Sequence, residues 1–324
     1  MHSYDALSED ERARRYEQLA RKALSVYALE NAELRFLGPG TNVVFRVQTD
    51  DGRWALRICH PGRDRNALMR ELLWLVAVNR DTELSVPEPV IMRSGELLRS
   101  VSMPGISGFH PCMLFRWVKG RPADELTPDH LRGVGRLTAS LHRHAASFRW
   151  PEELTITSSP LAYLTEALSA ERVRGHVRGE DVDTLLEAAS AIHRTARSLG
   201  DGRDVAGVIH GDLEQGNLLY HQGDARAIDF ERIHWNHYAY DLAVTLGELS
   251  SRKDFEQLED AYLEGYASVR PLPCDPDEHL PAFETMHTLT RVLSWLQAER
   301  LQHGEGDGFI RAAVAKVRRW LDEV

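Results

Sequence analysis

The chain changes character once, at Lys119-Gly120-Arg121-Pro122, and this change constrains the fold more than any other feature. Before it, short β-like segments predominate and one helical segment interrupts them. After it, segments with helical spacing predominate, and the few short β-like pieces lie within residues 207–228. Strands and helices kept in separate regions predict an α+β fold rather than alternating β-α units. We therefore expect two lobes, a small β-rich N-terminal lobe and a larger helical C-terminal lobe.

The N-terminal lobe is predicted to be a small antiparallel sheet with one inserted helix. Its strand candidates are residues 33–37, 43–48, 54–59, 90–91, 97–101 and 113–118, and its helix is 67–78. A further helix precedes the sheet. The expected division is an N-terminal helix over residues 1–30, a β-rich lobe over 31–118 and a helical lobe over 119–324, with a nucleotide-sized cleft at the boundary.

The C-terminal lobe is predicted to be mainly helical. Its helix candidates are residues 128–146, 161–174, 182–199, 239–250, 255–266, 281–300 and 309–321. The short β-like pieces 207–209, 218–220 and 225–228 interrupt them. These pieces surround the most chemically suggestive stretch of the chain.

Composition limits the partners that the chain can have. Its 324 residues are 43% hydrophobic, and its formal net charge is −10. The negative charge argues against nucleic acid or an anionic membrane, because phosphate groups would be repelled. No apolar run reaches the ~18 residues of a membrane span. The three cysteines are far apart and form no metal-ligand pattern. Together with the charged N-terminus, these features favour a cytoplasmic protein.

Residues 208–220 read VIHGDLEQGNLLY, and residues 227–231 read AIDFE. Asp212 follows His-Gly in a loop, where its carboxylate could accept a hydroxyl proton during transfer to phosphate. Asn217 and Asp229 offer a neutral and a charged oxygen. Magnesium prefers such hard oxygen ligands together with substrate phosphates. Because a two-strand hairpin separates the two segments, all three side chains can lie on one rim. We predict that Asp212 is a catalytic base and that Asn217 and Asp229 bind metal.

This combination resembles the catalytic loop and the metal-binding aspartate of kinases. HGD in place of HRD and DFE in place of DFG are similar to the aminoglycoside phosphotransferase/choline kinase superfamily. The resemblance runs from about residue 33 to residue 250. It implies a protein-kinase-like fold and an enzyme that uses ATP and Mg²⁺. The implied reaction moves the γ-phosphate of ATP to a hydroxyl of a small molecule, such as an aminoglycoside, an amino alcohol or a homoserine-like compound.

The resemblance also implies nucleotide-binding residues upstream. LGPGTNVVFRV at 37–47 is similar to the family's phosphate-covering hairpin, in which glycines free the backbone and N–H groups face phosphate. The alternative is a plain hairpin turn. MLFRWVKG at 113–120 resembles the segment that joins the lobes, whose backbone binds adenine. The residues implied are Gly38, Gly40, Thr41, Asn42, Arg116 and Val118.

Arg57 stands in the strand RWALRIC, where the family pattern has a phosphate-binding lysine. The chain has no lysine between Lys22 and Lys119 that could replace it. Arginine keeps the charge and can bind two phosphate oxygens. Glu71, on the helix RNALMRELLWL, is the expected ion-pair partner; the alternative is a solvated helix charge. The departure puts nucleotide affinity or rate in question.

The residues that receive the phosphate acceptor are harder to predict. The spacing DFE-x4-N-x3-YD resembles choline and ethanolamine kinases. The late helix HTLTRVLSWLQAER carries a single tryptophan, which speaks against choline itself. The acceptor-side candidates are Glu231, Trp235, Asn236, Tyr238, Arg291 and Trp295, of which the three aromatic residues are alternatively part of the core. The family pattern gives His210 and Asp241 a structural role.

The residues leave two other functions open. A bacterial stress-type Ser/Thr protein kinase shares the fold but needs an open groove for an extended peptide. A non-catalytic nucleotide-binding scaffold is favoured only by Arg57 and is opposed by the intact Asp212, Asn217 and Asp229. The sequence names neither the acceptor nor the oligomeric state.

Overall fold

The structure is a computed structural model, and it describes residues 9–29, 31–37, 42–154, 160–170, 173, 175–297 and 306–324. The chain divides into two compact units, Met1–Gly120 and Arg121–Val324. The division falls at the point where the sequence changes character. Among the helices of the described residues, none combines the length and the apolarity needed to cross a bilayer.

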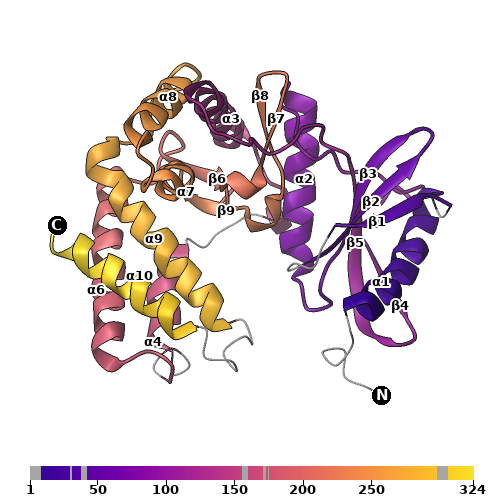
Figure 1. The fold of residues 1–324 in the computed structure, drawn as a ribbon, viewed down its shortest axis with the longest axis horizontal. Coiled ribbons are helices and arrows are strands. Elements are labelled where there is room, and N and C mark those ends of the chain that lie inside the picture. Colours follow the sequence, from indigo (N-terminus) through magenta and orange to yellow (C-terminus); the bar gives the residue numbers. More distant parts are fainter. Residues whose placement is uncertain are drawn as a thin grey trace. The chain divides into compact units, whose positions relative to one another are not determined.

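The first unit is built on a five-stranded antiparallel sheet (Figure 1). Its strand order is β1 (Glu33–Phe36), β2 (Val43–Thr49), β3 (Gly52–Ile58), β5 (Ile106–Arg116) and β4 (Arg99–Met103). Strand β3 lies between β2 and β5. Its residue Arg57 is paired with Val44 of β2 on one side and with Met113 of β5 on the other.

Helices cover the two faces of this sheet (Figure 1). Helix α1 (Glu9–Leu24), followed by the 3-10 helix η2 (Ser25–Tyr27), shares a hydrophobic core with Leu56 of β3 and Leu114 of β5. Arg57, the next residue in the strand, points to the opposite face because successive side chains alternate. There it meets α2 (Arg65–Asp81).

The prediction was wrong for two strands of this sheet. No strand forms at residues 90–91, where Val90 donates a single backbone hydrogen bond to Leu114 (2.8 Å) beside an isolated bridge at Pro89. The two prolines that precede this segment, Pro87 and Pro89, have no N–H to extend a ladder. Conversely, β5 begins at Ile106, seven residues before the predicted strand. This stretch contains Gly108 and Pro111, two residue types that weaken a strand pattern.

The second unit is mainly helical. It contains α3 (Pro128–Ser147), α4 (Pro160–Ser169), α6 (Gly179–Leu199), α7 (Ala239–Leu249), α8 (Phe255–Ala267), α9 (Pro276–Gln297) and α10 (Gly306–Leu321), with the 3-10 turns η3 (Glu152–Leu154), η4 (Gln215–Asn217) and η5 (Phe230–Arg232). Two short antiparallel ladders join β6 (Ala206–Ile209) to β9 (His234–His237) and β7 (Leu218–His221) to β8 (Asp224–Ala227).

Two helix contacts organise this unit (Figure 1). Glycines let the backbones of helices α3 and α8 approach each other closely. A Cβ atom on Gly135 would lie 2.0 Å from the carbonyl oxygen of Tyr262, and one on Gly265 would lie 2.1 Å from that of Arg132. Helix α9 packs on α7, and α6 and α10 pack on α9. The β6–β9 ladder and α7 lie between α3 and α8 on one side and α9 on the other (Figure 1).

One strand of this unit was not predicted, and helix α9 begins earlier than expected. Strand β9 was not predicted, because His-Trp-Asn-His lacks apolar alternation and pairs with β6 through its backbone. Helix α4 ends at Ser169, and of the predicted continuation to residue 174, residues 171, 172 and 174 lie outside the described residues. Helix α9 begins at Pro276, five residues before the expected start, and carries Pro281 inside it. A proline removes one backbone hydrogen bond, but the packed helix continues through it.

Candidate active site

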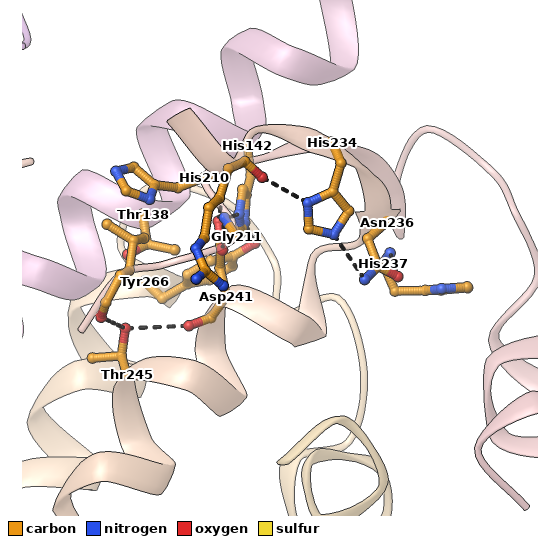
Figure 2. A network of polar contacts seen from close by, with 12 residues as sticks. Thr138, His142, His210, Gly211, His234, Asn236, His237, Asp241, Thr245 and Tyr266 are labelled. Carbon is orange, nitrogen blue, oxygen red and sulfur yellow. Dashed lines mark hydrogen bonds and ion pairs between the residues drawn. The ribbon is translucent and has the colours of Figure 1, made fainter. Parts of the chain in front are cut away.

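The loop after β6 is fixed by one buried carboxylate, that of Asp241 in the first turn of α7. It accepts the backbone N–H groups of His210 (2.9 Å) and Gly211 (2.8 Å). It also accepts the Nε2–H of His142 (3.1 Å), as Figure 2 shows. Burial alone raises the pKa of this carboxyl, but these hydrogen bonds outweigh burial and hold the pKa below its usual value. Asp241 therefore remains ionised and anchors the loop.

His142, on α3, connects this anchor to α8. Burial lowers the pKa of its imidazole. A neutral ring fits its surroundings, since Nε2–H donates to Asp241 and Nδ1 accepts the hydroxyl of Tyr266 at 2.9 Å. Its ring stacks on that of Tyr238, with 4.4 Å between the ring centroids. Tyr238, an acceptor-side candidate from the sequence, has no exposed surface and also lies under Arg270.

The glycine of the His-Gly-Asp sequence is required by the turn itself. Gly211 has φ 78°, and a Cβ there would lie 2.6 Å from the carbonyl oxygen of Arg232. Before it, His210 is fully buried, its Nε2 lies 3.2 Å from the carbonyl oxygen of Ile228, and its ring packs on Phe230. Burial lowers the pKa of His210. The turn thus ties the loop after β6 to the end of β8.

Asp212 and Asn217 are joined directly. The Asn217 side-chain nitrogen donates to the backbone oxygen of Asp212 (2.9 Å) and to its Oδ2 atom (3.1 Å). The Asn217 carbonyl accepts the N–H of Ile228 (2.9 Å), which is the residue before Asp229. Asp212, Asn217 and Asp229 consequently stand on adjoining segments.

Asp229 has an unusual backbone conformation, with φ 63° and ψ 66° at the start of η5. This left-handed region disfavours residues other than glycine by ~1 kcal/mol or more. Its side chain is on the surface. Such strain concentrates where a side chain is needed for function.

Three residues that the sequence did not single out surround Asp212. The Arg232 Nε atom lies 3.7 Å from Asp212 Oδ2. Glu214 and His287 each bring one polar atom into a cluster with Asp212 in which these atoms lie within 4.8 Å of one another. Burial raises the pKa of Asp212, and Arg232 opposes the rise. Glu214 is only two residues from Asp212, but no spacing connects His287, on α9, to that loop.

His287 is a neutral group under ordinary conditions. Burial, reinforced by Arg291 and Arg232, lowers its pKa to about 4. Its Nε2 atom lies 3.7 Å from Oε1 of Glu214. Within the described residues, Nε2 is buried without a hydrogen-bond partner.

Glu214 and His287 line a pocket of about 410 Å³. The remaining lining residues come from α7, α9 and α10: Ala243, Val244, Gly247, Glu248, Glu284, Thr288, Arg291, Phe309, Ala312, Ala313 and Lys316. Since Asp212 shares a cluster with two of the lining residues, the pocket adjoins the carboxylate predicted to act as base.

Of the acceptor-side candidates, Arg291 is the one that lines this pocket. Trp295 instead lies against Phe309, with 6.4 Å between the ring centroids. Trp235 lies on β9 under the guanidinium of Arg203. Asn236 is 1% exposed, and its side-chain oxygen accepts the N–H of His237 (2.9 Å), an arrangement that fixes the strand. Glu231 is half-buried in η5.

The first unit contains a second polar centre. Arg57 and Glu71 form an ion pair, and both side chains are more than nine-tenths buried. Arg57 also contacts Met113, and its guanidinium lies 5.2 Å from the Phe115 ring centre. Glu71 is therefore a buried partner of Arg57 and not a solvated charge.

The structure describes only some of the other residues predicted to bind the nucleotide. Gly38, Gly40 and Thr41 lie outside the described residues, and Asn42 is half-buried directly before β2. The N–H of Arg116 donates to the Glu88 carbonyl (2.8 Å), and the next N–H, of Trp117, donates to Arg53 (3.1 Å). Val118 follows, half-buried.

A helical unit with this aspartate loop and an antiparallel sheet with a buried Arg–Glu pair together define a phosphotransferase of protein-kinase-like fold. The chain belongs to the phosphotransferase enzyme family (APH), whose family model matches residues 33–272. The family and the bilobal α+β fold predicted from the sequence are thereby confirmed.

The relatives are small-molecule kinases. Amicoumacin kinase of Bacillus subtilis is 26% identical over 237 residues, which cover 71% of this chain and 67% of that kinase. Homoserine kinase of Neisseria meningitidis serogroup B is 27% identical over 292 residues, covering 87% and 86%. A microcompartment-associated aminopropanol kinase has a TM-score of 0.73 and 26% identity, with 94% of each chain covered.

One solved relative was captured with its ligands. Amicoumacin kinase hAmiN, in complex with AMP-PNP and Ca²⁺, has a TM-score of 0.77 and 18% identity, with 96% of each chain covered. The likeness to this structure is one of fold. The chain is accordingly an enzyme of a kinase family whose members use small molecules.

Proposed function

We propose that the protein transfers the γ-phosphate of ATP to a hydroxyl group of a small molecule, with Asp212 as the base. One observation carries the proposal. The Asp212 carboxylate is held by Asn217 and adjoins a pocket of about 410 Å³ through Glu214 and His287. A carboxylate fixed at the edge of a small pocket suits a bound hydroxyl compound better than an extended peptide, which would need an open groove.

In this reaction the acceptor oxygen attacks the γ-phosphorus in line, and the bond from that phosphorus to the bridging oxygen of ADP breaks. The hydroxyl proton moves to a side-chain oxygen of Asp212. Asn217 fixes the orientation of that carboxylate. Arg232 opposes the effect of burial on its pKa, which favours the ionised form that a base requires.

The donor set at the rim fits Mg²⁺. The Asn217 side-chain nitrogen makes both contacts with Asp212, so its amide oxygen takes no part in either hydrogen bond. Asp229 holds a surface carboxylate one residue beyond the Asn217–Ile228 hydrogen bond. These hard oxygens would hold the ion. When bound, the metal neutralises charge on the phosphates.

The nucleotide-binding roles rest on the first unit. We assign Arg57 to the ATP phosphates, positioned by Glu71. Gly38, Gly40, Thr41 and Asn42 would cover the phosphates, as the family resemblance implies. Adenine recognition falls to the backbone at Arg116–Val118, with Val118 the better candidate because the N–H groups of Arg116 and Trp117 are already used within the unit. The nucleotide and cation in the hAmiN structure support this choice of cosubstrate.

The test is ADP release from MgATP in the presence of hydroxyl acceptors. The panel comprises aminoglycosides, amino alcohols and homoserine, with a generic protein substrate beside them. Asp212→Asn should lower the turnover stimulated by an acceptor by about 10²-fold or more, because a positioned base contributes 10²–10⁴-fold. The variant should still be stabilised against heat by MgATP.

Asp224→Asn is the matched control, since it makes the same change at an exposed position on the β7–β8 hairpin. It should retain wild-type turnover. Near-normal turnover by Asp212→Asn would refute its role as base. Labelling of protein alone would favour a protein kinase.

A further inference from the structure

Helix α10 forms one wall of the pocket that adjoins the proposed base. Its lining residues, Phe309, Ala312, Ala313 and Lys316, recur at helical spacing and therefore share one face of the helix. The family match ends at residue 272, so it does not extend to this wall. The contacts that fix the orientation of α10 consequently determine the shape of the pocket on this side.

Apolar packing alone fixes the rotation of α10 about its own axis only loosely. The helix packs on α6 and α9 (Figure 1), and its buried stripe consists of Ile310, Val314 and Val317. Burial of apolar surface is non-directional, so it resists separation of the helix more strongly than a small rotation about the stripe. A hydrogen-bonded charge pair, in contrast, requires a particular geometry.

Asp181, in the first turn of α6, provides such a pair. Its Oδ1 atom accepts Nη2 of Arg318 on α10 at 2.7 Å, and its Oδ2 atom accepts Nε of Arg178, the N-cap residue of α6, at 2.8 Å. The Asp181 side chain is only 6% exposed, so a lost partner leaves a buried charge less well compensated. Lys316 of α10 also pairs with Glu284 at 3.6 Å, but nearly half of the lysine is exposed, and such pairs contribute little.

The Asp181–Arg318 pair holds the edge of α10 that lies away from the pocket. Arg318 follows Phe309 by nine residues, which places it about half a turn around the helix axis. The buried stripe lies between these two edges. Without the pair, a rotation about the stripe would displace the pocket wall on the other edge. Neither Asp181 nor Arg318 is among the residues that line the pocket, so an effect on the acceptor has to pass through α10.

We propose that Asp181 is a positioning residue for the phosphate acceptor, because its pair with Arg318 fixes the orientation of the α10 wall. Asp181 acts on acceptor affinity through α10 and takes no part in the chemical step. This inference rests on the proposed function, which makes the pocket the acceptor site. Binding of ATP is assigned to residues of the first unit and should be unaffected.

The kinetics of Arg318→Gln test the effect on the pocket. The assay is ADP release from MgATP with the panel compound that gives the highest kcat/KM. The KM for this acceptor should rise about three- to tenfold, while kcat and the KM for MgATP change by less than about twofold. Arg318→Lys keeps the charge and should recover part of the affinity. Asp181→Asn should raise the acceptor KM to a similar extent, and the double variant should raise it no further.

Arg178→Gln is the matched control, because Arg178 pairs with the same carboxylate but lies at the start of α6. It should keep the acceptor KM near the wild-type value. If it raises this KM as much as Arg318→Gln does, Asp181 acts through α6, and the role of α10 is refuted.

Thiol labelling tests the orientation of α10 without any acceptor. Ala313 lines the pocket and is 6% exposed, whereas Ala315 is fully on the surface of the same helix. Iodoacetamide should modify Ala313→Cys at least about threefold faster when Arg318→Gln is also present, because the loosened wall opens more often. Ala315→Cys should react at the same rate with and without Arg318→Gln. Mass spectrometry measures the label at each position.

The two measurements separate this inference from the proposed function. Equal labelling at position 313 would show that the pair does not orient α10. Faster labelling with an unchanged acceptor KM would show that the wall does not set acceptor affinity. Either result overturns the proposal and leaves the kinase function intact. If no hydroxyl compound stimulates ADP release, the proposed function fails, and the acceptor role of Asp181 fails with it.

Discussion

Arg232 acts on the proposed base directly, since its Nε atom lies 3.7 Å from the Oδ2 atom of Asp212. Burial raises the pKa of Asp212, and Arg232 opposes this rise. Replacing the arginine by glutamine should therefore raise that pKa further. Because a base acts in its ionised form, the acid limb of the pH profile of kcat/KM should move to higher pH, with activity recovering under alkaline conditions.

Two variants complete the comparison at Arg232. Arg232→Lys keeps the positive charge and should leave the acid limb closer to its wild-type position. Arg194→Gln removes an exposed arginine of α6 and should have no effect on it. An acid limb that stays in place in Arg232→Gln would show that the guanidinium does not influence Asp212.

At the scale of elements, Asp241 holds the loop after β6 against α3 and α7. Its carboxylate accepts three N–H groups, from His210, Gly211 and His142. Asparagine would turn an N–H₂ group toward one of these donors. Asp241→Asn should lower the free energy of unfolding by about 3 kcal/mol, as expected when a buried charged network loses a member. Urea denaturation at pH 7 measures this loss.

The pH dependence of that loss has a defined sign. The folded-state pKa of Asp241 lies below its ordinary value, so its contribution is present above the unfolded pKa and disappears as pH falls through the folded value. The difference in stability between wild type and Asp241→Asn should shrink below about pH 4. Asp183→Asn, an exposed change on α6, should show no such difference at any pH. A constant difference would mean that the network does not depend on the ionised carboxylate.

Elements with a local signal were predictable, and contacts between distant segments were not. The helices followed from apolar spacing, and the sequence proposes Asp212, Asn217 and Asp229 as site residues from the single stretch 212–229, which contains one hairpin. Strand β9 was missed because its pairing with β6 depends on backbone geometry that leaves no pattern in His-Trp-Asn-His. The same limit applies to His287, which comes close to Glu214 only because α9 packs on α7.

At the scale of the whole molecule, the proposed nucleotide residues belong to the first unit, and the proposed metal ligands belong to the second. Asp229 provides a way to separate stability from metal binding, because its backbone is left-handed. Asp229→Gly relieves that strain but adds flexibility to the unfolded chain, and these effects nearly cancel. The ligand-free protein should unfold within about 1 kcal/mol of wild type. The rise in melting temperature caused by AMP-PNP with Mg²⁺, relative to AMP-PNP with EDTA, should be lost.

A control variant shows whether the loss of the Mg²⁺-dependent rise is specific to the Asp229 carboxylate. Asp224→Gly makes the same change at an exposed position of the neighbouring hairpin and should retain the Mg²⁺-dependent rise. A ligand that binds the folded state raises the melting temperature in proportion to the logarithm of its concentration over its Kd, so the loss in Asp229→Gly converts directly into weakened binding. If Asp229→Gly keeps the full rise, the metal is held by other oxygens. If it lowers the stability of the ligand-free protein by several kcal/mol, the left-handed aspartate serves the fold instead.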